Sequence, residues 1–228
     1  FYKSAAAEER DGGFRLVLDG KPARTPGKNP VAVPRRSLGE AVAAEWNRQG
    51  PASDPAAMPL TRIVNSAIDG VAAQRQAVIA EIARYAGSDL VCYRAGEPER
   101  LVAEQAAAWD PILAWARQAL GARFVLSVGV VHVEQPTAAL AAVRARLDEI
   151  ASPFRLAALH VMTTLTGSVL IALAHAEGAL DADQAWAAAH VDERYQESLW
   201  GEDEEAIARR TRREAEFRAA SQICALAG

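Results

Sequence analysis

The segment FRLVLDG, residues 14–20, carries both a strand pattern and a turn signal, and so predicts that the chain begins with a β-hairpin. Its phenylalanine and two leucines occupy every second position. This alternation predicts a half-buried β-strand with those three side chains facing inward and Val17 facing outward. The Asp19-Gly20 pair at its end is a strong signal for a two-residue hairpin turn. A return strand is therefore expected at residues 21–25.

The residues that follow extend this hairpin into a small sheet. Pro22 has no N–H to donate to a neighbouring strand, which predicts that the return strand lies at an edge of the sheet. Residues 26–30 are rich in proline and glycine and predict a second turn, and residues 31–33 predict a third short strand. We therefore expect a small antiparallel sheet in an N-terminal domain of residues 1–70.

Helical signals dominate the rest of the chain. The segment SLGE at residues 37–40 is a capping-box pattern that predicts a helix start, and Asp110-Pro111 is typical of the boundary between two helices. Residues 124–134 are rich in β-branched side chains and predict one late strand. Helices are expected at residues 37–49, 60–68, 71–86, 101–109 and 110–121, and then from residues 137, 153, 181 and 202 onward. The fold class is thus α+β, with a multi-helical C-terminal domain of residues 71–228.

Residues 156–176 contain no aspartate, glutamate, lysine or arginine. That length would suffice for a membrane span, but two histidines and several threonines make insertion into a bilayer unfavourable. We interpret the segment as a single buried helix that ends at Gly178. Membrane association through this segment remains an alternative.

The composition excludes several classes of protein. The chain has 228 residues and a formal net charge of -4, so binding of nucleic acid would need a local basic patch. Cys92 and Cys224 each lie in an apolar context, which indicates buried thiols in a reducing compartment and not a disulfide framework. Four arginines follow a run of acids near the C-terminus, and we interpret them as a solvated, salt-bridged helix face in preference to a phosphate-binding patch. They are Arg209, Arg210, Arg212 and Arg213.

The sequence lacks the common motifs of catalysis and cofactor binding. It has no glycine-rich dinucleotide fingerprint, no phosphate-binding loop, no nucleophile elbow and no paired cysteine motif. The spacing of its histidines is not that of metal ligands. These histidines are His132, His160, His175 and His190. The sequence therefore predicts no metal site and no cofactor.

The segment ERYQESLWG, residues 193–201, places a tryptophan on the polar side of a helix. Val191, Tyr195 and Leu199 recur at helical spacing and predict an apolar stripe. The opposite side carries Glu193, Gln196, Glu197 and Trp200, and Gly201 is expected to end the helix. A tryptophan so placed either anchors a partner protein or folds back into the core.

Two carboxylates in this segment allow a second hypothesis. Glu193 and Glu197 are neighbours on one helical turn, and their mutual repulsion could raise a pKa for acid–base work. Together with His190 they would suit an unrecognised hydrolase or transferase. The sequence has no nucleophile or pocket signal, so a solvated acidic face is the preferred interpretation.

Several short segments occur in the order found in one known family. They are FYK at the N-terminus, LDGKPARTP, AVAAEWNRQG, MPLT, QAAAWDP and ERYQESLWG. This combination resembles the assembly chaperones of the ATP synthase alpha subunit, usually named ATP synthase mitochondrial F1 complex assembly factor 2. The resemblance extends over almost the whole chain.

The resemblance implies a protein without enzymatic activity and without a cofactor. Such a protein holds the unassembled alpha subunit until the beta subunit replaces it, and it binds no nucleic acid and is not stably inserted in a membrane. The family's acidic position falls on Glu193 or Glu197, beside Trp200 and Gly201, and we add Gln196 to this partner-binding set. The family occurs in bacteria and mitochondria. The composition favours a bacterial member in the cytoplasm, and a eukaryotic one would lie in the mitochondrial matrix.

Overall fold

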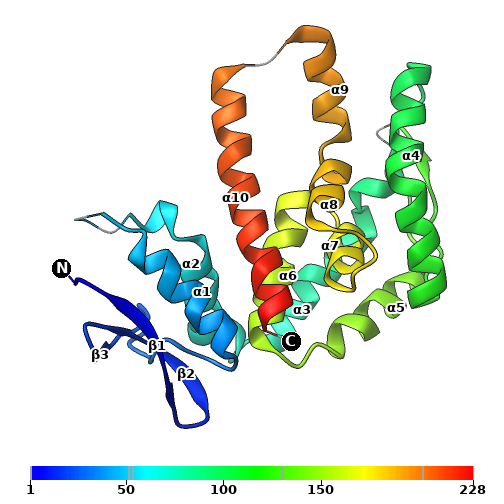
Figure 1. Cartoon of the computed structure of the whole chain (residues 1–228). Coiled ribbons are helices and arrows are strands. Elements are labelled where there is room, and N and C mark those ends of the chain that lie inside the picture. The colour runs from blue at the N-terminus through cyan, green and yellow to red at the C-terminus, as the bar shows by residue number, and fades with distance from the viewer. Residues whose placement is uncertain (1, 51, 53, 130, 202, 228) are drawn as a thin grey trace.

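The chain folds into a small sheet at one end and a set of helices that covers the rest (Figure 1). The computed structural model describes residues 2–50, 52, 54–129, 131–201 and 203–227. Three helices stand upright from the helical base in Figure 1: α4 (Glu99–Trp115), α9 (Val191–Trp200) and α10 (Glu204–Leu226). The α+β fold class is therefore confirmed.

The sheet is built around the hairpin that the sequence predicts. Its strands are β1 (Ala5–Arg10), β2 (Gly13–Leu18), β3 (Lys21–Pro22) and β4 (Ala32–Val33). All pairs are antiparallel, and β1, β3 and β4 each pair with β2. Pro22 lies in β3 at the end of the sheet, as its missing N–H requires. The return strand is shorter than expected, and β1 is an additional strand that the sequence analysis did not identify.

The prediction that Val17 faces outward does not make it exposed: this residue is only 2% exposed. In the register of the sheet, Val17 lies between Ala6 of β1 and Pro22 of β3. Cross-strand neighbours on the same face cover each other. Val17 is thus buried although it lies outside the main core.

The first helix packs closely on the other face of the sheet. A Cβ atom at Gly39 would lie 2.9 Å from the Cβ of Ala7 and 3.1 Å from the Cβ of Phe14. Glycine thus permits close contact between helix and sheet. The helix, α1 (Arg36–Asn47), begins one residue before Ser37, and no side chain caps it, so the predicted capping box is wrong. Packing against the sheet fixes its start instead.

The remaining elements surround one apolar core. The other α-helices are α2 (Pro59–Ser66), α3 (Arg75–Arg84), α5 (Thr137–Asp148), α6 (Pro153–Thr166), α7 (Val169–Ala176) and α8 (Ala182–Ala189). The short helical turns are η1 (Pro55–Ala57), η2 (Ala67–Val71), η3 (Tyr85–Ser88), η4 (Leu90–Cys92) and η5 (Ala116–Leu120). The helix starts predicted at residues 153 and 181 are confirmed: Ser152 caps α6, and Asp181 and Gln184 form a capping box at the start of α8.

The predicted boundary at Asp110-Pro111 is wrong, because α4 runs through it. Proline inside a helix removes one backbone hydrogen bond. On either side of the proline, the side chains of Trp109 and Ile112 are almost completely buried. Burial of these two large side chains offsets the local cost and keeps the helix continuous.

The charge-free segment forms two helices and not one. Gly167 adopts a φ of 68° between α6 and α7, a left-handed conformation that favours glycine. The hydroxyl of Ser168 then accepts a hydrogen bond from the N–H of Ile171 and caps α7. Within the described part of the chain, every helix is either too short or too polar to cross a lipid bilayer.

The predicted strand at residues 124–134 is largely wrong. Among the described residues of this range, only β6 (Ser127–Val128) forms, and it pairs in parallel with β5 (Tyr93–Arg94). Apolar β-branched residues favour strands only where a sheet can cover them. Here β5 is only two residues long, so it can pair with no more than a short strand.

The predicted domain boundary remains a prediction. The junction at residues 70 and 71 falls inside η2, which continues α2 without an intervening linker. The C-terminal helix α10 packs against α2 as well as α6, and the Arg62 guanidinium of α2 lies 2.8 Å from the Glu216 carboxylate of α10. The last helix therefore contacts a helix assigned to the first domain.

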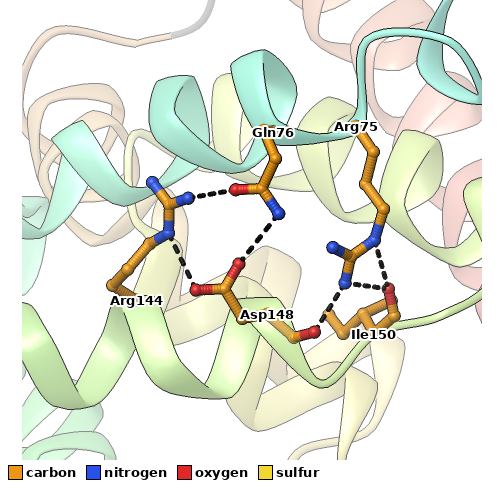
Figure 2. A network of polar contacts seen from close by, with 5 residues as sticks. All are labelled: Arg75, Gln76, Arg144, Asp148 and Ile150. Carbon is orange, nitrogen blue, oxygen red and sulfur yellow. Dashed lines mark hydrogen bonds and ion pairs between the residues drawn. The ribbon is translucent and has the colours of Figure 1, made fainter.

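A polar network joins α3 to α5 on the surface (Figure 2). The Asp148 carboxylate accepts hydrogen bonds from Arg144 at 3.0 Å and from Gln76 at 3.4 Å. The Arg75 guanidinium donates to the backbone carbonyls of Asp148 and Ile150 at the end of α5. The bond from Arg144 lowers the pKa of Asp148. Exposed charges contribute little stability, so we assign the network to the alignment of these two helices.

Asp89 connects η4 to the start of α7 in the core. Its fully buried carboxylate accepts hydrogen bonds from the N–H of Val91 at 3.2 Å and from the N–H of Leu170 at 3.1 Å. Burial raises the pKa of Asp89 to about 6. Burial also raises the pKa of the free Cys92 thiol nearby to about 12, and the Asp89 charge adds to that rise.

A dependence of stability on pH follows from this buried acid. Between the ordinary aspartate pKa of 3.8 and about 6, the folded chain binds more protons at Asp89 than the unfolded chain does. The free energy of unfolding is therefore expected to fall with rising pH in this window, by up to about 1.4 kcal/mol per pH unit. Asp89→Asn should remove this component. Urea unfolding of both proteins at a series of pH values measures it, and two parallel curves would contradict the assignment.

Candidate partner-binding site

Helix α9 runs antiparallel to the first half of α4. The Gln105 amide donates a 2.7 Å hydrogen bond to the Asp192 carboxylate, and the Arg100 guanidinium lies 5.4 Å from the ring centroid of Tyr195. Residues early in α4 thus contact residues late in α9. The C-terminal end of α9 therefore lies beside the N-terminal end of α4.

The apolar stripe of α9 is only partly confirmed. Val191 and Tyr195 are buried, whereas Leu199 is 54% exposed. Arg100, which contacts Tyr195, is the second residue of α4. Leu199 lies one turn further along α9 than Tyr195, beyond the N-terminal end of α4. It continues the apolar pattern of α9, but α4 does not cover it.

Trp200 is the most exposed large apolar side chain among the described residues, with 84% of its surface accessible. It is the last residue of α9. Gly201 follows with a φ of 84°, and its N–H donates a 2.9 Å bond to the carbonyl of Glu197. The interpretation in which Trp200 folds back into the core is therefore wrong, and its side chain lies on the surface.

The two glutamates of the segment have different surroundings. Glu197 is partly buried and forms an ion pair with Arg210, so it joins α9 to α10. Glu193 and Gln196 are exposed, and within the described residues neither side chain forms a hydrogen bond or an ion pair. Glu193 borders a hollow of about 240 Å³ beside the α6–α7 turn. Glu197 borders another hollow of about 590 Å³ between α8, α9 and α10.

His190 does not bring the two carboxylates into one reactive cluster. Its ring is buried against Trp186, with centroids 3.9 Å apart, and its Nδ1 lies 2.8 Å from the Trp186 carbonyl. It touches both hollows, but Glu193 and Glu197 line different ones. Residues 2–50, 52, 54–129, 131–201 and 203–227 contain no group of three or more His, Cys, Asp or Glu side chains placed to hold a metal ion.

Several large apolar side chains near α4 are also exposed, and the pattern of the sequence does not assign them to the partner-binding site. The chain leaves β5 and enters α4 shortly afterwards, and β6 pairs with β5. The large apolar side chains that are exposed in the described structure are Val102, Val125, Leu126, Val128, Val131, Leu199 and Trp200. Four of them, Val125, Leu126, Val128 and Val131, lie in the apolar run at residues 124–134 that the sequence predicts as a strand.

Comparisons with known proteins agree with this architecture. The family model described as ATP12 chaperone protein matches residues 1–117. The solved structure of Atp12 from Paracoccus denitrificans is 42% identical, with a TM-score of 0.92, and covers 100% of this chain and 97% of that chain. A solved protein from Agrobacterium tumefaciens, described as a candidate chaperone, is 49% identical, with a TM-score of 0.95, and covers 99% of this chain and 85% of that chain.

A relative from fission yeast extends the similarity to eukaryotes. Protein atp12, mitochondrial, of Schizosaccharomyces pombe is 24% identical over 218 residues, which cover 90% of this chain and 75% of that protein. The resemblance to the assembly chaperones of ATP synthase is thus confirmed at the level of the family. The present chain belongs to the ATP12 chaperone protein family.

Proposed function

We propose that this chain is an assembly chaperone that binds the unassembled alpha subunit of ATP synthase and shields its interface until the beta subunit replaces it. The observation that carries the proposal is the exposed pair Leu199 and Trp200 at the free end of α9. Large apolar side chains exposed together on a protein surface typically mark an interaction site. Tryptophan is also among the residues that contribute most to protein interfaces.

The physical benefit of such a protein is protection by mass action. An alpha subunit without its partners exposes an apolar interface that can self-associate. A protein that covers this interface lowers the concentration of the free, sticky form. The beta subunit then displaces the chaperone if it binds the same interface more tightly.

We assign separate roles to the five residues of the partner-binding set. Trp200 anchors the alpha subunit, and Glu193 and Gln196 form the polar rim around it. Glu197 positions the end of α9 through its ion pair with Arg210. Gly201 ends the helix and so leaves Trp200 at its tip. This division follows from the exposure of each side chain.

We further infer that the chain acts without making or breaking a covalent bond. Glu197 is paired with Arg210 and borders a different hollow from Glu193, which counts against an acid–base pair. We place the protein in the bacterial cytoplasm, because its identity to two bacterial structures, 42% and 49%, exceeds the 24% to the mitochondrial relative. A eukaryotic source would place it in the mitochondrial matrix.

Co-purification tests the proposed function directly. The tagged chain is mixed with alpha alone, with beta alone, and with both subunits, without added nucleotide. We expect capture of alpha, no capture of beta, and loss of alpha when beta is added. Failure to capture alpha under conditions where alpha stays monomeric would refute the proposal.

Charge reversal at Glu193 tests the rim of the site. Glu193 forms no hydrogen bond or ion pair within the described residues, so Glu193→Lys should leave the far-ultraviolet circular dichroism unchanged. A repulsive charge at the edge of an interface is expected to weaken capture of alpha about tenfold. Glu134→Lys, a change at an exposed position outside α9 whose side chain likewise forms no hydrogen bond or ion pair within the described residues, is the matched control and should capture alpha normally. Normal capture by Glu193→Lys would remove this residue from the site.

A further inference from the structure

A groove with a volume of about 710 Å³ separates α10 from the end of α1 and the start of α2. We call it the arginine groove. Its arginines come from both walls and are Arg48, Arg62, Arg209, Arg212, Arg213 and Arg218. It lies on elements other than α9 and is therefore distinct from the partner-binding set.

Helical spacing directs one face of α10 into this groove. Arg209, Arg212, Glu216 and Ala219 recur three or four residues apart and line the same wall. At 1.5 Å per residue, the part of α10 from Arg209 to Glu216 spans about 10 Å. The positive charge is thus spread along the wall and is not gathered at a point.

The acids near the groove leave part of this charge uncompensated. Arg62 pairs with Glu216, and Arg218 pairs with Asp183 and Glu214. Arg213 donates to the carbonyl of Leu165. In contrast, the side chains of Arg48, Arg209 and Arg212 form neither an ion pair nor a hydrogen bond within the described residues.

Glu45 does not neutralise these arginines. Its carboxylate is buried and accepts hydrogen bonds from the N–H groups of Leu60 and Thr61 at 2.8 Å and from the Thr61 hydroxyl at 2.6 Å. The groove is therefore locally basic in a chain whose formal net charge is -4. The expectation of a salt-bridged arginine face holds for Arg210 and not for Arg209 and Arg212.

We propose that the arginine groove binds an acidic segment of a partner polypeptide. Arginine donors on two walls match carboxylates that are distributed along a chain. Its lining also includes Ala56, Pro59, Leu60 and Ala215, which offer apolar contact beside the charged groups. A free inorganic anion would gain nothing from that apolar surface. The identity of the partner as the alpha subunit rests on the proposed function, whereas the preference for an acidic segment does not.

A labelled peptide tests the groove without the alpha subunit. Fluorescence anisotropy is measured with a peptide of about ten residues that alternates glutamate and alanine, a length that as a helix would span about 15 Å. A lysine–alanine peptide of the same length is the probe of opposite charge. We expect binding of the glutamate peptide alone, and weaker binding as sodium chloride is raised.

Paired variants decide whether this groove is the binding site. Arg209→Glu with Arg212→Glu should weaken peptide binding at least about tenfold, a loss typical of reversing a charged contact. Arg117→Glu with Arg123→Glu makes the same change of charge at exposed positions outside the groove, and should bind as the unmodified chain does. Equal binding by both double variants, or equal binding of both peptides, would overturn the proposal. So would displacement of the peptide by inorganic phosphate beyond the effect of its ionic strength.

Capture of the alpha subunit then identifies the partner. The variant that carries Arg209→Glu and Arg212→Glu should capture alpha about tenfold more weakly than the control that carries Arg117→Glu and Arg123→Glu. If the unmodified chain fails to capture alpha, the proposed function fails, but the peptide measurement still decides the groove. If alpha is captured equally by both variants, the groove does not contact alpha and this part of the inference is wrong.

Discussion

Replacing Trp200 with alanine is expected to weaken capture of the ATP synthase alpha subunit about a hundredfold. The ring is 84% exposed in the free chain, so its removal deletes surface that only a partner can cover. Tryptophans at the centre of interfaces commonly contribute about 2 to 4 kcal/mol on truncation, and a hundredfold loss corresponds to about 2.7 kcal/mol. Titration of labelled alpha with each protein measures the two dissociation constants.

Two controls separate this effect from a loss of folding. Because Trp200 packs against little else, the free energy of unfolding should change by less than about 0.5 kcal/mol. Trp200→Phe keeps an aromatic anchor and should retain most of the affinity. Lys21→Ala, an exposed change in β3, should bind alpha normally. An unchanged dissociation constant for Trp200→Ala would exclude the tip of α9 as the anchor.

Replacing Trp109 with alanine is expected to lower the free energy of unfolding by about 4 kcal/mol, as for other buried tryptophans. Only 1% of this residue is exposed, and its indole N–H donates a 2.7 Å bond to the carbonyl of Ala188 in α8. The Arg94 guanidinium lies 5.2 Å from the ring centroid. The change would leave a cavity and a buried carbonyl without its donor. Urea unfolding followed by circular dichroism measures the loss.

Trp109→Phe distinguishes the two parts of this effect. Phenylalanine fills most of the space but cannot donate to Ala188, so the expected loss is about 1 to 3 kcal/mol, the cost of leaving a buried acceptor without its partner. A loss below about 1 kcal/mol for Trp109→Ala would show that α4 and α8 are held together by other contacts. Trp109 is thus a buried residue that holds helices together, whereas Trp200 is exposed at the end of α9.

Local chemistry made several elements predictable. The Asp19-Gly20 turn and the edge position of Pro22 depend on backbone dihedral angles and on a missing donor, which are properties of the residues themselves. The caps at Ser152 and Asp181 depend on hydrogen bonds that reach only three residues. Such features were predicted correctly because nothing distant is needed to form them.

Elements that depend on distant partners were not predictable in this way. Pro111 is a reliable helix start only where no buried neighbours hold the helix together, and Trp109 and Ile112 do so here. Of the β-branched run at residues 124–134, only the two residues of β6 pair with another strand in the described structure, because the partner β5 is itself two residues long. Gly167 splits the charge-free segment, although the apolar pattern continues on both sides.

The candidate site also combines features that local sequence predicts with features that depend on distant partners. Local patterns in the sequence suffice to predict the α+β class, the hairpin, the family resemblance and the helix that carries residues 193–200 with glycine at its end. The exposure of Leu199 and Trp200 and the pairing of Glu197 with Arg210 follow only from how the helices pack. Exposure depends on where the neighbouring helix α4 begins, and pairing depends on which face α10 turns toward α9. Neither quantity is encoded in the local pattern of residues.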